Sequence, residues 1–118
     1  MAHPTVLVVD DQEDVLRTLA YYVGQGGYRV TALSRFEDAR QFIDETPPDM
    51  LVTDVRLGAF NGLQLVLQLR AARPGAPIVV LSAFDDPTLR EEAERHGARY
   101  LLKPLGKQEL LECLASFA

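Results

Sequence analysis

Several short apolar runs of the sequence are each followed at once by a side chain that could do chemistry. The runs are residues 5–9, 50–53, 78–81 and 100–102, and the residues that follow them are Asp10 with Asp11, then Asp54, Ser82 and Lys103. Short runs rich in β-branched residues are typical of strands buried on both faces. Parallel strands share a carboxyl edge, where open α/β sheets bind ligands. We therefore expect these side chains to converge at one edge of a sheet.

Carboxylates that converge in this way would repel one another unless a cation lay between them. Carboxylate oxygens, together with backbone carbonyls and water, suit Mg²⁺, which also accepts phosphate oxygens as ligands. A simpler alternative is that Asp10 and Asp11 only cap the helix that follows them. The presence of Asp54 and Lys103 after neighbouring strands favours the metal site.

Asp54, beside a metal ion and an ammonium group, has the features of a nucleophile for phosphoryl transfer. A carboxylate can attack phosphorus to form an acyl phosphate, and Lys103 would neutralise charge on the transferred group. Ser82 would offer its hydroxyl to the phosphoryl group, although a strand-end hydroxyl often bonds only its own backbone. Lys103 could be an ordinary surface lysine, but Pro104 after it, a candidate for a cis peptide bond, favours a place at the site.

Composition limits the fold and the classes of function. The 118 residues, 47% hydrophobic and 25% charged, have the length and balance of one globular domain. The net charge of -5 argues against direct nucleic-acid binding. No apolar run approaches the roughly 20 residues that span a membrane. The early first strand leaves no room for a signal peptide, and the single Cys113 fits a reducing cytoplasm, where we expect the protein to be.

The segments between the apolar runs have the spacing of amphipathic helices. Ser34 is expected to cap the second of them, with Glu37 in a capping box, and residues 28–33 read as a further strand. The helices are expected at residues 12–23, after Ser34 up to Pro47, and at 63–72, 87–96 and 107–117. Strict alternation of strands and helices predicts a single α/β domain, doubly wound around a five-stranded parallel sheet with five helices.

Taken in order, these residues resemble the receiver domain of response regulators in two-component signal transduction. The resemblance covers essentially the whole chain, residues 1–118. The matching pieces are Val8-Val9-Asp10-Asp11, Asp54, Asn61-Gly62, Leu81-Ser82-Ala83, Gly97-Ala98, and Lys103-Pro104 followed by Glu109-Leu110. Each piece is weak alone, but the ordered set is specific. The resemblance implies a flavodoxin-like fold with strand order 2-1-3-4-5.

The same resemblance implies a role for each site residue. Asp54 is implied as the phosphoacceptor, with a sensor histidine kinase or histidine phosphotransfer protein as the donor. Tyr100 stands where the family has its rotamer-switch aromatic, although it could be only a half-buried strand residue. The implied Mg²⁺ ligands are Asp10, Asp11, Asp54 and the backbone carbonyl of Arg56, and the implied phosphoryl-binding and switch residues are Ser82, Lys103 and Tyr100.

The implied function is a phosphorylation-dependent signalling switch rather than an enzyme with its own substrate. Its only chemistry would be self-phosphotransfer and slow autodephosphorylation. The output would be a change in partner binding, or self-association, through the fourth helix, the fifth strand and the fifth helix. The alternatives are a receiver-like interaction module that is not phosphorylated, and a small aspartyl-phosphate phosphatase. A phosphatase would need a general acid where this chain has Arg56, which cannot donate a proton.

The sequence departs from the family pattern in three places. Gly58 stands where proline is common, which predicts a looser loop after Asp54. Leu105 stands where phenylalanine is common. Only one residue separates Gly97-Ala98 from Tyr100, where the family usually has two, so the orientation of Tyr100 is open.

Overall fold

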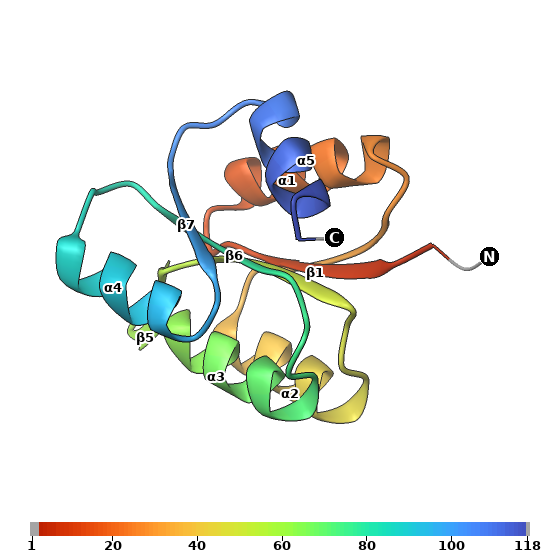
Figure 1. The fold of residues 1–118 in the computed structure, drawn as a ribbon. Coiled ribbons are helices and arrows are strands. Elements are labelled where there is room, and N and C mark those ends of the chain that lie inside the picture. The colour runs from red at the N-terminus through yellow and green to blue at the C-terminus, as the bar shows by residue number, and fades with distance from the viewer. Residues whose placement is uncertain (1–2, 118) are drawn as a thin grey trace.

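A parallel sheet of five strands lies at the centre of the molecule (Figure 1). The computed structural model describes residues 3–117, so residues 1, 2 and 118 of the expected domain lie outside it. The strand order is β2-β1-β3-β6-β7, with every neighbouring pair parallel. The strands are β1 (Thr5–Val9), β2 (Arg29–Leu33), β3 (Met50–Asp54), β6 (Ile78–Ser82) and β7 (Arg99–Leu102). When the five strands of this sheet are numbered by their order along the chain, the order is the predicted 2-1-3-4-5. The fold class is therefore confirmed.

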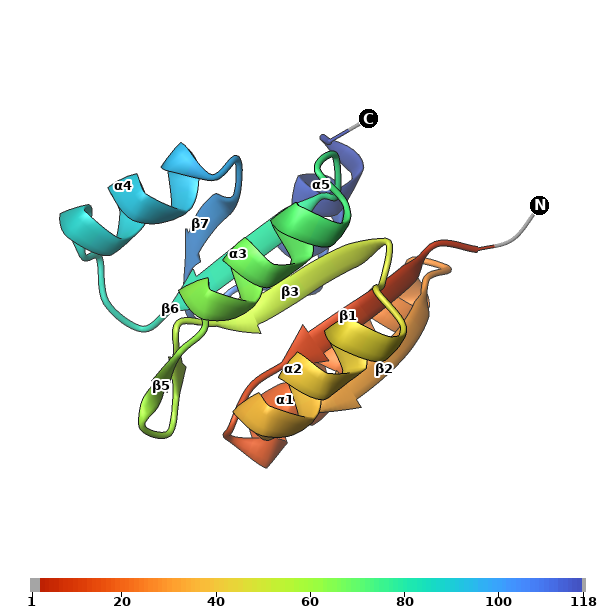
Figure 2. The same cartoon turned by 90° about the horizontal axis from the view of Figure 1, so that it is seen from below.

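Helices cover both faces of the sheet (Figure 2). They are α1 (Glu13–Gln25), α2 (Phe36–Glu45), α3 (Leu63–Ala72), α4 (Pro87–Arg95) and α5 (Lys107–Ala115). α1 and α5 lie on one face, and α2, α3 and α4 lie on the other. Within residues 3–117, no helix combines the length and the apolar character needed to cross a membrane.

Each central strand buries side chains in both layers of the core. Val6 and Val8 of β1 pack with α1 and α5, whereas Leu7 and Val9 pack with α2 and α3. Because successive side chains of a strand point to opposite faces, both sets must be apolar. This requirement explains why the strands stand out in the sequence as unbroken apolar runs.

The expected Ser34 cap is wrong. α2 begins at Phe36, its N-cap is Arg35 in extended conformation, and no side chain caps it. The start of the helix brings Phe36 into the core, where it is only 8% exposed. Glu37 and Asp38 in the first turn compensate by placing negative charge at the positive end of the helix dipole.

The segment after Asp54 contains a small antiparallel hairpin that the sequence did not predict. β4 (Arg56–Leu57) pairs with β5 (Phe60–Asn61) through a turn at Gly58 and Ala59. Gly58 has a φ of 63°, and a positive φ at the first central residue only is the pattern of a type II′ turn. The Asn61-Gly62 pair leads into a helix, as expected, and Asn61 Oδ1 accepts the Leu63 N–H at 2.8 Å. The segment after Asp54 is therefore held in a hydrogen-bonded hairpin, and the looser loop predicted from Gly58 is not found.

Gly62 lies against the backbone of the phosphoacceptor candidate. A Cβ atom at position 62 would overlap the Asp54 carbonyl oxygen and lie 3.0 Å from Thr53 Oγ1. The Gly62 N–H also donates to the Val55 carbonyl at 2.6 Å. A side chain at this position would push the end of β3 out of place.

We predict that Gly62→Ala destabilises the fold by roughly 1–3 kcal/mol, the usual cost of overpacking a filled site. Urea denaturation monitored by circular dichroism measures this change. Gly75→Ala is the matched control, because a Cβ there meets no atom within 4 Å. Equal stability of the two variants would mean that position 62 accommodates a side chain without displacing the end of β3.

Candidate functional site

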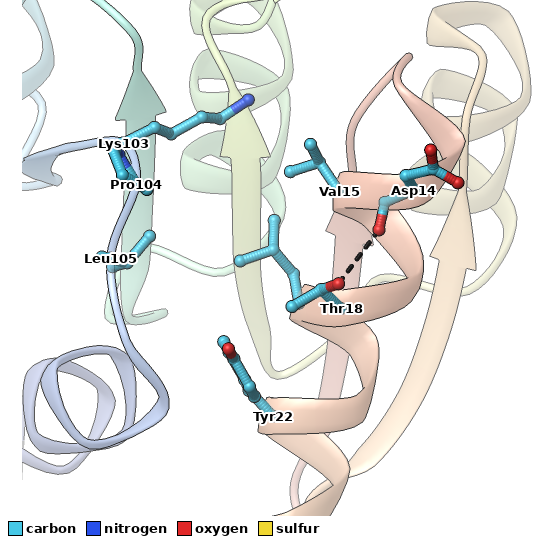
Figure 3. A pocket seen from close by; sticks show the side chains of 8 residues that line it. Asp14, Val15, Thr18, Tyr22, Lys103, Pro104 and Leu105 are labelled. Atoms are coloured by element: carbon cyan, nitrogen blue, oxygen red, sulfur yellow. Dashed lines mark hydrogen bonds between the residues drawn. The ribbon is translucent and has the colours of Figure 1, made fainter.

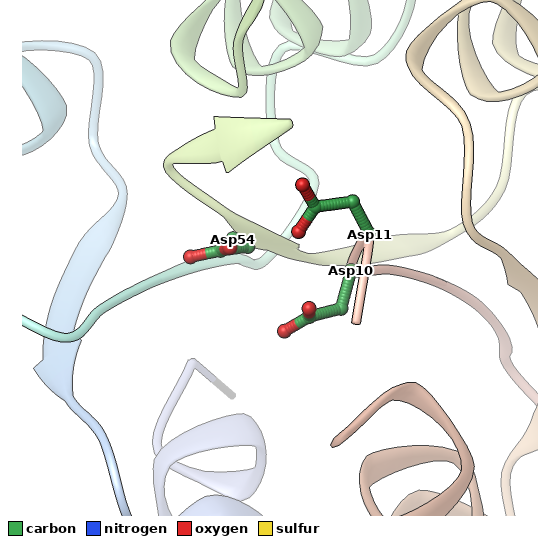
Figure 4. A group of neighbouring side chains, drawn as sticks. All are labelled: Asp10, Asp11 and Asp54. Carbon is green, nitrogen blue, oxygen red and sulfur yellow. The ribbon is translucent and has the colours of Figure 1, made fainter. Parts of the chain in front are cut away.

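The carboxyl ends of the central strands bring three aspartates together (Figure 4). Asp10 and Asp11 directly follow β1, and Asp54 is the last residue of β3. One carboxylate oxygen of each lies within 4.8 Å of the others. An open cleft of about 470 Å³ at this edge is lined by Asp11, Asp54, Arg56, Ser82, Phe84 and Lys103, among other residues. The predicted convergence of these side chains is therefore present in the structure.

Lys103 supplies the positive charge at the centre of this acidic edge. Its Nζ lies 2.6 Å from Asp10 Oδ2 and 3.4 Å from Asp54 Oδ1. Asp10 is 0% exposed, and its Oδ1 accepts the Gln12 N–H at 2.9 Å. Asp10 thus supports the turn into α1 and pairs with Lys103 at the same time. The Lys103–Pro104 peptide bond is cis.

Burial and charge act in opposite directions on Asp54. Burial is the largest influence and raises the pKa of the Asp54 carboxyl, which is only 8% exposed. The ammonium of Lys103 lowers this pKa, and the nearby Asp10 and Asp11 carboxylates raise it. The net shift is upward, because the attraction to Lys103 does not offset the loss of hydration.

Asp11 is the exposed member of the acidic pair. Its Oδ2 accepts a hydrogen bond from the Gly58 N–H at 3.0 Å, across 47 positions of sequence. Arg56, on the same hairpin, extends its guanidinium over the exposed ring of Phe84, 5.6 Å from the ring centroid. The Arg56 side chain is therefore a surface group at the rim of the cleft, and its carbonyl remains a predicted metal ligand.

Ser82 and Tyr100 both use the carbonyl of Phe84. The Ser82 hydroxyl donates to this oxygen at 2.9 Å and accepts the Phe84 N–H at 3.1 Å. The Tyr100 hydroxyl donates to the same oxygen at 2.8 Å. Tyr100 is 4% exposed, so the short junction before β7 still turns its ring inward. In this structure the hydroxyls of Ser82 and Tyr100 are held by the β6–α4 loop.

The sequence did not predict the part that Arg90 has in this arrangement. Its guanidinium lies 4.8 Å from the centroid of the Tyr100 ring and 3.0 Å from an oxygen of Asp85. Arg90 stands among the charged residues of α4, and the sequence holds no signal that separates it from them. Only the packing of α4 beside β7 places it over the tyrosine.

The donor set at the acidic edge fits Mg²⁺. The Asp10, Asp11 and Asp54 oxygens are hard ligands close enough to share one ion, and the cleft leaves room for the water molecules that Mg²⁺ retains. Asp11 Oδ1 accepts no hydrogen bond from any described residue. The carboxylates of Asp10 and Asp54 both interact with Lys103, whose positive charge offsets part of the repulsion between them.

A second cavity, of about 320 Å³, lies between α1 and the segment after β7 (Figure 3). Its wall includes Val15, Leu19, Tyr22, Pro104 and Leu105. Lys103 borders both cavities, but Figure 3 shows its ammonium directed away from this one, toward the end of β3. The cavity therefore offers mostly apolar surface and is chemically distinct from the acidic cleft.

Asp54→Asn should stabilise the metal-free protein, and the gain should depend on pH. The folded-state pKa of Asp54 lies above its unfolded value of 3.8, so ionisation costs stability as pH rises through this interval. The difference in stability between Asp54→Asn and wild type should be smallest below pH 3.8. It should grow as the pH rises from 3.8 through the raised folded-state pKa of Asp54, and level off at higher pH. Melting temperatures in a chelator at a series of pH values measure it. A gain that stays constant with pH would contradict the upward shift.

Comparison with known proteins places this geometry in a family. A sequence model of the response regulator receiver domain matches residues 6–115. The transcriptional regulatory protein KdpE of Mycobacterium tuberculosis is 36% identical over 90% of this chain and 47% of its own length. A response regulator from Burkholderia pseudomallei, solved with a phosphorylated aspartic acid and a calcium ion, is 29% identical, with a TM-score of 0.85 over 94% of this chain and 66% of that one.

The fold alone is shared more widely. A CheY-like receiver domain from Methanospirillum hungatei is 21% identical, with a TM-score of 0.90 over 98% of this chain and 93% of that one. The chain spans about a quarter to half the length of the first curated relatives that it matches. With its acidic edge, its parallel sheet and its match over nearly all described residues, the chain belongs to the response regulator receiver domain family.

Proposed function

We propose that this domain is a switch that accepts a phosphoryl group on Asp54 from a sensor histidine kinase or a histidine phosphotransfer protein. The observation that carries the proposal is the cluster of Asp10, Asp11 and Asp54 with Lys103 inserted between two of them. The phosphorylated aspartic acid of the Burkholderia pseudomallei response regulator supports it. We place the domain in the cytoplasm, where such donors would reach it, with no direct contact to nucleic acid.

The residues of the acidic edge divide the chemistry among them. An Asp54 carboxylate oxygen attacks phosphorus, and the bond to the donor nitrogen breaks as the acyl phosphate forms. Lys103, 3.4 Å from Asp54, stabilises the negative charge of the transferred group. Mg²⁺, held by Asp10, Asp11, Asp54 and the Arg56 carbonyl, would supply further charge neutralisation. Slow autodephosphorylation then returns the domain to its starting state.

The conformational change caused by phosphorylation would begin at the Phe84 carbonyl, which accepts hydrogen bonds from both Ser82 and Tyr100. A phosphoryl group on Asp54 offers the Ser82 hydroxyl a charged acceptor, which is stronger than a backbone carbonyl. When Ser82 leaves Phe84, the β6–α4 loop is free to shift and Tyr100 to repack with it. Of its apolar side chains, α4 buries only Ala93 fully and Leu89 in part, so this helix should be easily moved. Partner binding, or self-association, would then change across α4, β7 and α5.

The first functional prediction is Mg²⁺-dependent phosphorylation at Asp54. Wild-type protein incubated with Mg²⁺ and a small acyl-phosphate donor should gain one phosphoryl group by intact mass. Asp54→Asn should gain none, because its amide is not a nucleophile for phosphorus. Asp44→Asn is the control, since Asp44 lies in α2 away from the cleft. Equal labelling of the Asp54→Asn protein would make the site assignment wrong, and no labelling of wild type would favour the unphosphorylated interaction module.

The second prediction concerns the output surface. Beryllofluoride, a phosphoryl mimic, should change amide chemical shifts around Asp54, at residues 82–95 and at residues 99–107. Tyr100→Ala should remove the shifts in α4 and β7 while leaving those beside Asp54, because the ring links the loop to the strand. Shifts that run instead to α1 would contradict the route through Tyr100.

A further inference from the structure

The β4–β5 hairpin touches the acidic edge at one point and α2 at another. At its turn, the Gly58 N–H donates to Asp11 Oδ2 at 3.0 Å. On β5, the ring of Phe60 stacks on Phe36, with centroids 4.5 Å apart and planes 9° from parallel. Phe36 is the first residue of α2 and is buried, whereas Phe60 is 46% exposed. The hairpin thus forms a short bridge from a carboxylate of the acidic edge to the start of a helix.

The contact with Asp11 depends on glycine at position 58. The residue has a φ of 63°, which favours glycine, and it must also have an N–H to donate. Proline cannot adopt this positive φ, because its ring fixes φ near −65°, and it has no backbone N–H to donate. Leu57 pairs with Phe60 directly across the turn. Because the turn has only two residues, a displacement of Gly58 must move Phe60 with it.

We propose that the Asp11–Gly58 hydrogen bond couples cation binding at the acidic edge to the hairpin and, through Phe60 and Phe36, to α2. The proposal rests on the proposed Mg²⁺ site. Asp11 Oδ1 accepts no hydrogen bond from residues 3–117, so Asp11 can bind a cation through this oxygen while Oδ2 keeps the Gly58 N–H. Gly58 is then a positioning residue for Asp11, and the orientation of the carboxylate and that of the turn are linked.

The surface that would respond differs from the α4–β7–α5 face. It is a groove of about 410 Å³ lined by Phe36, Arg40, Phe60, Gln64 and Gln68. Its two rings belong to the stack that the hairpin holds together. A change at Asp11 would therefore alter this groove without any movement of Tyr100 or α4.

An amide-shift titration of the unphosphorylated protein with Mg²⁺ tests the coupling. Amides at residues 10–12, at Gly58 and at residues 36–37 should shift with one common dissociation constant. Shifts at residues 10–12 without shifts at Gly58 and residues 36–37 would overturn the coupling and leave the Mg²⁺ site intact. No shift at any of them would overturn the Mg²⁺ site and the coupling together.

Phe60→Leu separates the two links of the bridge. It retains the Gly58 N–H but removes the ring stack, so the Gly58 shift should persist while the shift at residues 36–37 is lost. Tyr21→Leu is the control, because Tyr21 is also an exposed aromatic and lies on α1, outside the hairpin. If the shift at residues 36–37 survives in Phe60→Leu, the route through the stack is wrong.

Substitutions at Gly58 test the hydrogen bond itself. Gly58→Asn keeps the donor and tolerates a positive φ, so its Mg²⁺ dissociation constant should stay within about twofold of wild type. Gly58→Pro removes the donor and should weaken Mg²⁺ binding about tenfold, as loss of a group that orients a metal ligand does. Wild-type affinity in a folded Gly58→Pro protein would overturn the positioning role. If Gly58→Pro does not fold by circular dichroism, the Phe60→Leu titration decides the proposal.

Discussion

The ion pair between Lys103 and Asp10 is the interaction on which the acidic edge depends. It joins residues 93 positions apart, and the Asp10 carboxylate is fully buried. A buried carboxylate without a partner would be strongly destabilising, so the chain after β7 must return to the end of β1. This return brings the lysine within 3.4 Å of Asp54. The same contact that compensates the buried charge thus supplies a cation beside the proposed nucleophile.

The two sides of the cleft lead to different parts of the molecule. On one side, Ser82 and Tyr100 share the carbonyl of Phe84, and Arg90 lies over the tyrosine ring. These contacts connect the end of β6 to α4 and β7. On the other side, Asp11 holds the turn of the β4–β5 hairpin through Gly58. The acidic edge therefore has two separate sets of contacts, one on each side of the cleft.

The sequence by itself determined the architecture and the composition of the site. The central strands of a parallel sheet are buried on both faces, so they appear as apolar runs that can be located without coordinates. Their carboxyl ends share one edge, so the side chains that follow Val9, Leu81 and Leu102, together with Asp54 at the end of β3, had to converge. The weak apolar stripe of α4 was also readable, and in the structure Ala93 is the one residue that this helix buries.

Only the tertiary structure decided the details that connect the site to its surroundings. Strands of two residues are too short to show a periodic pattern, so the sequence did not reveal the β4–β5 hairpin. Glycine at position 58 predicted a looser loop, whereas in the structure the turn is hydrogen-bonded to Asp11. The start of α2 follows the packing of Phe36 rather than the capping preference of Ser34. These features depend on contacts between residues far apart in the chain. Local sequence preferences carry no information about such contacts until the sheet has brought the residues together.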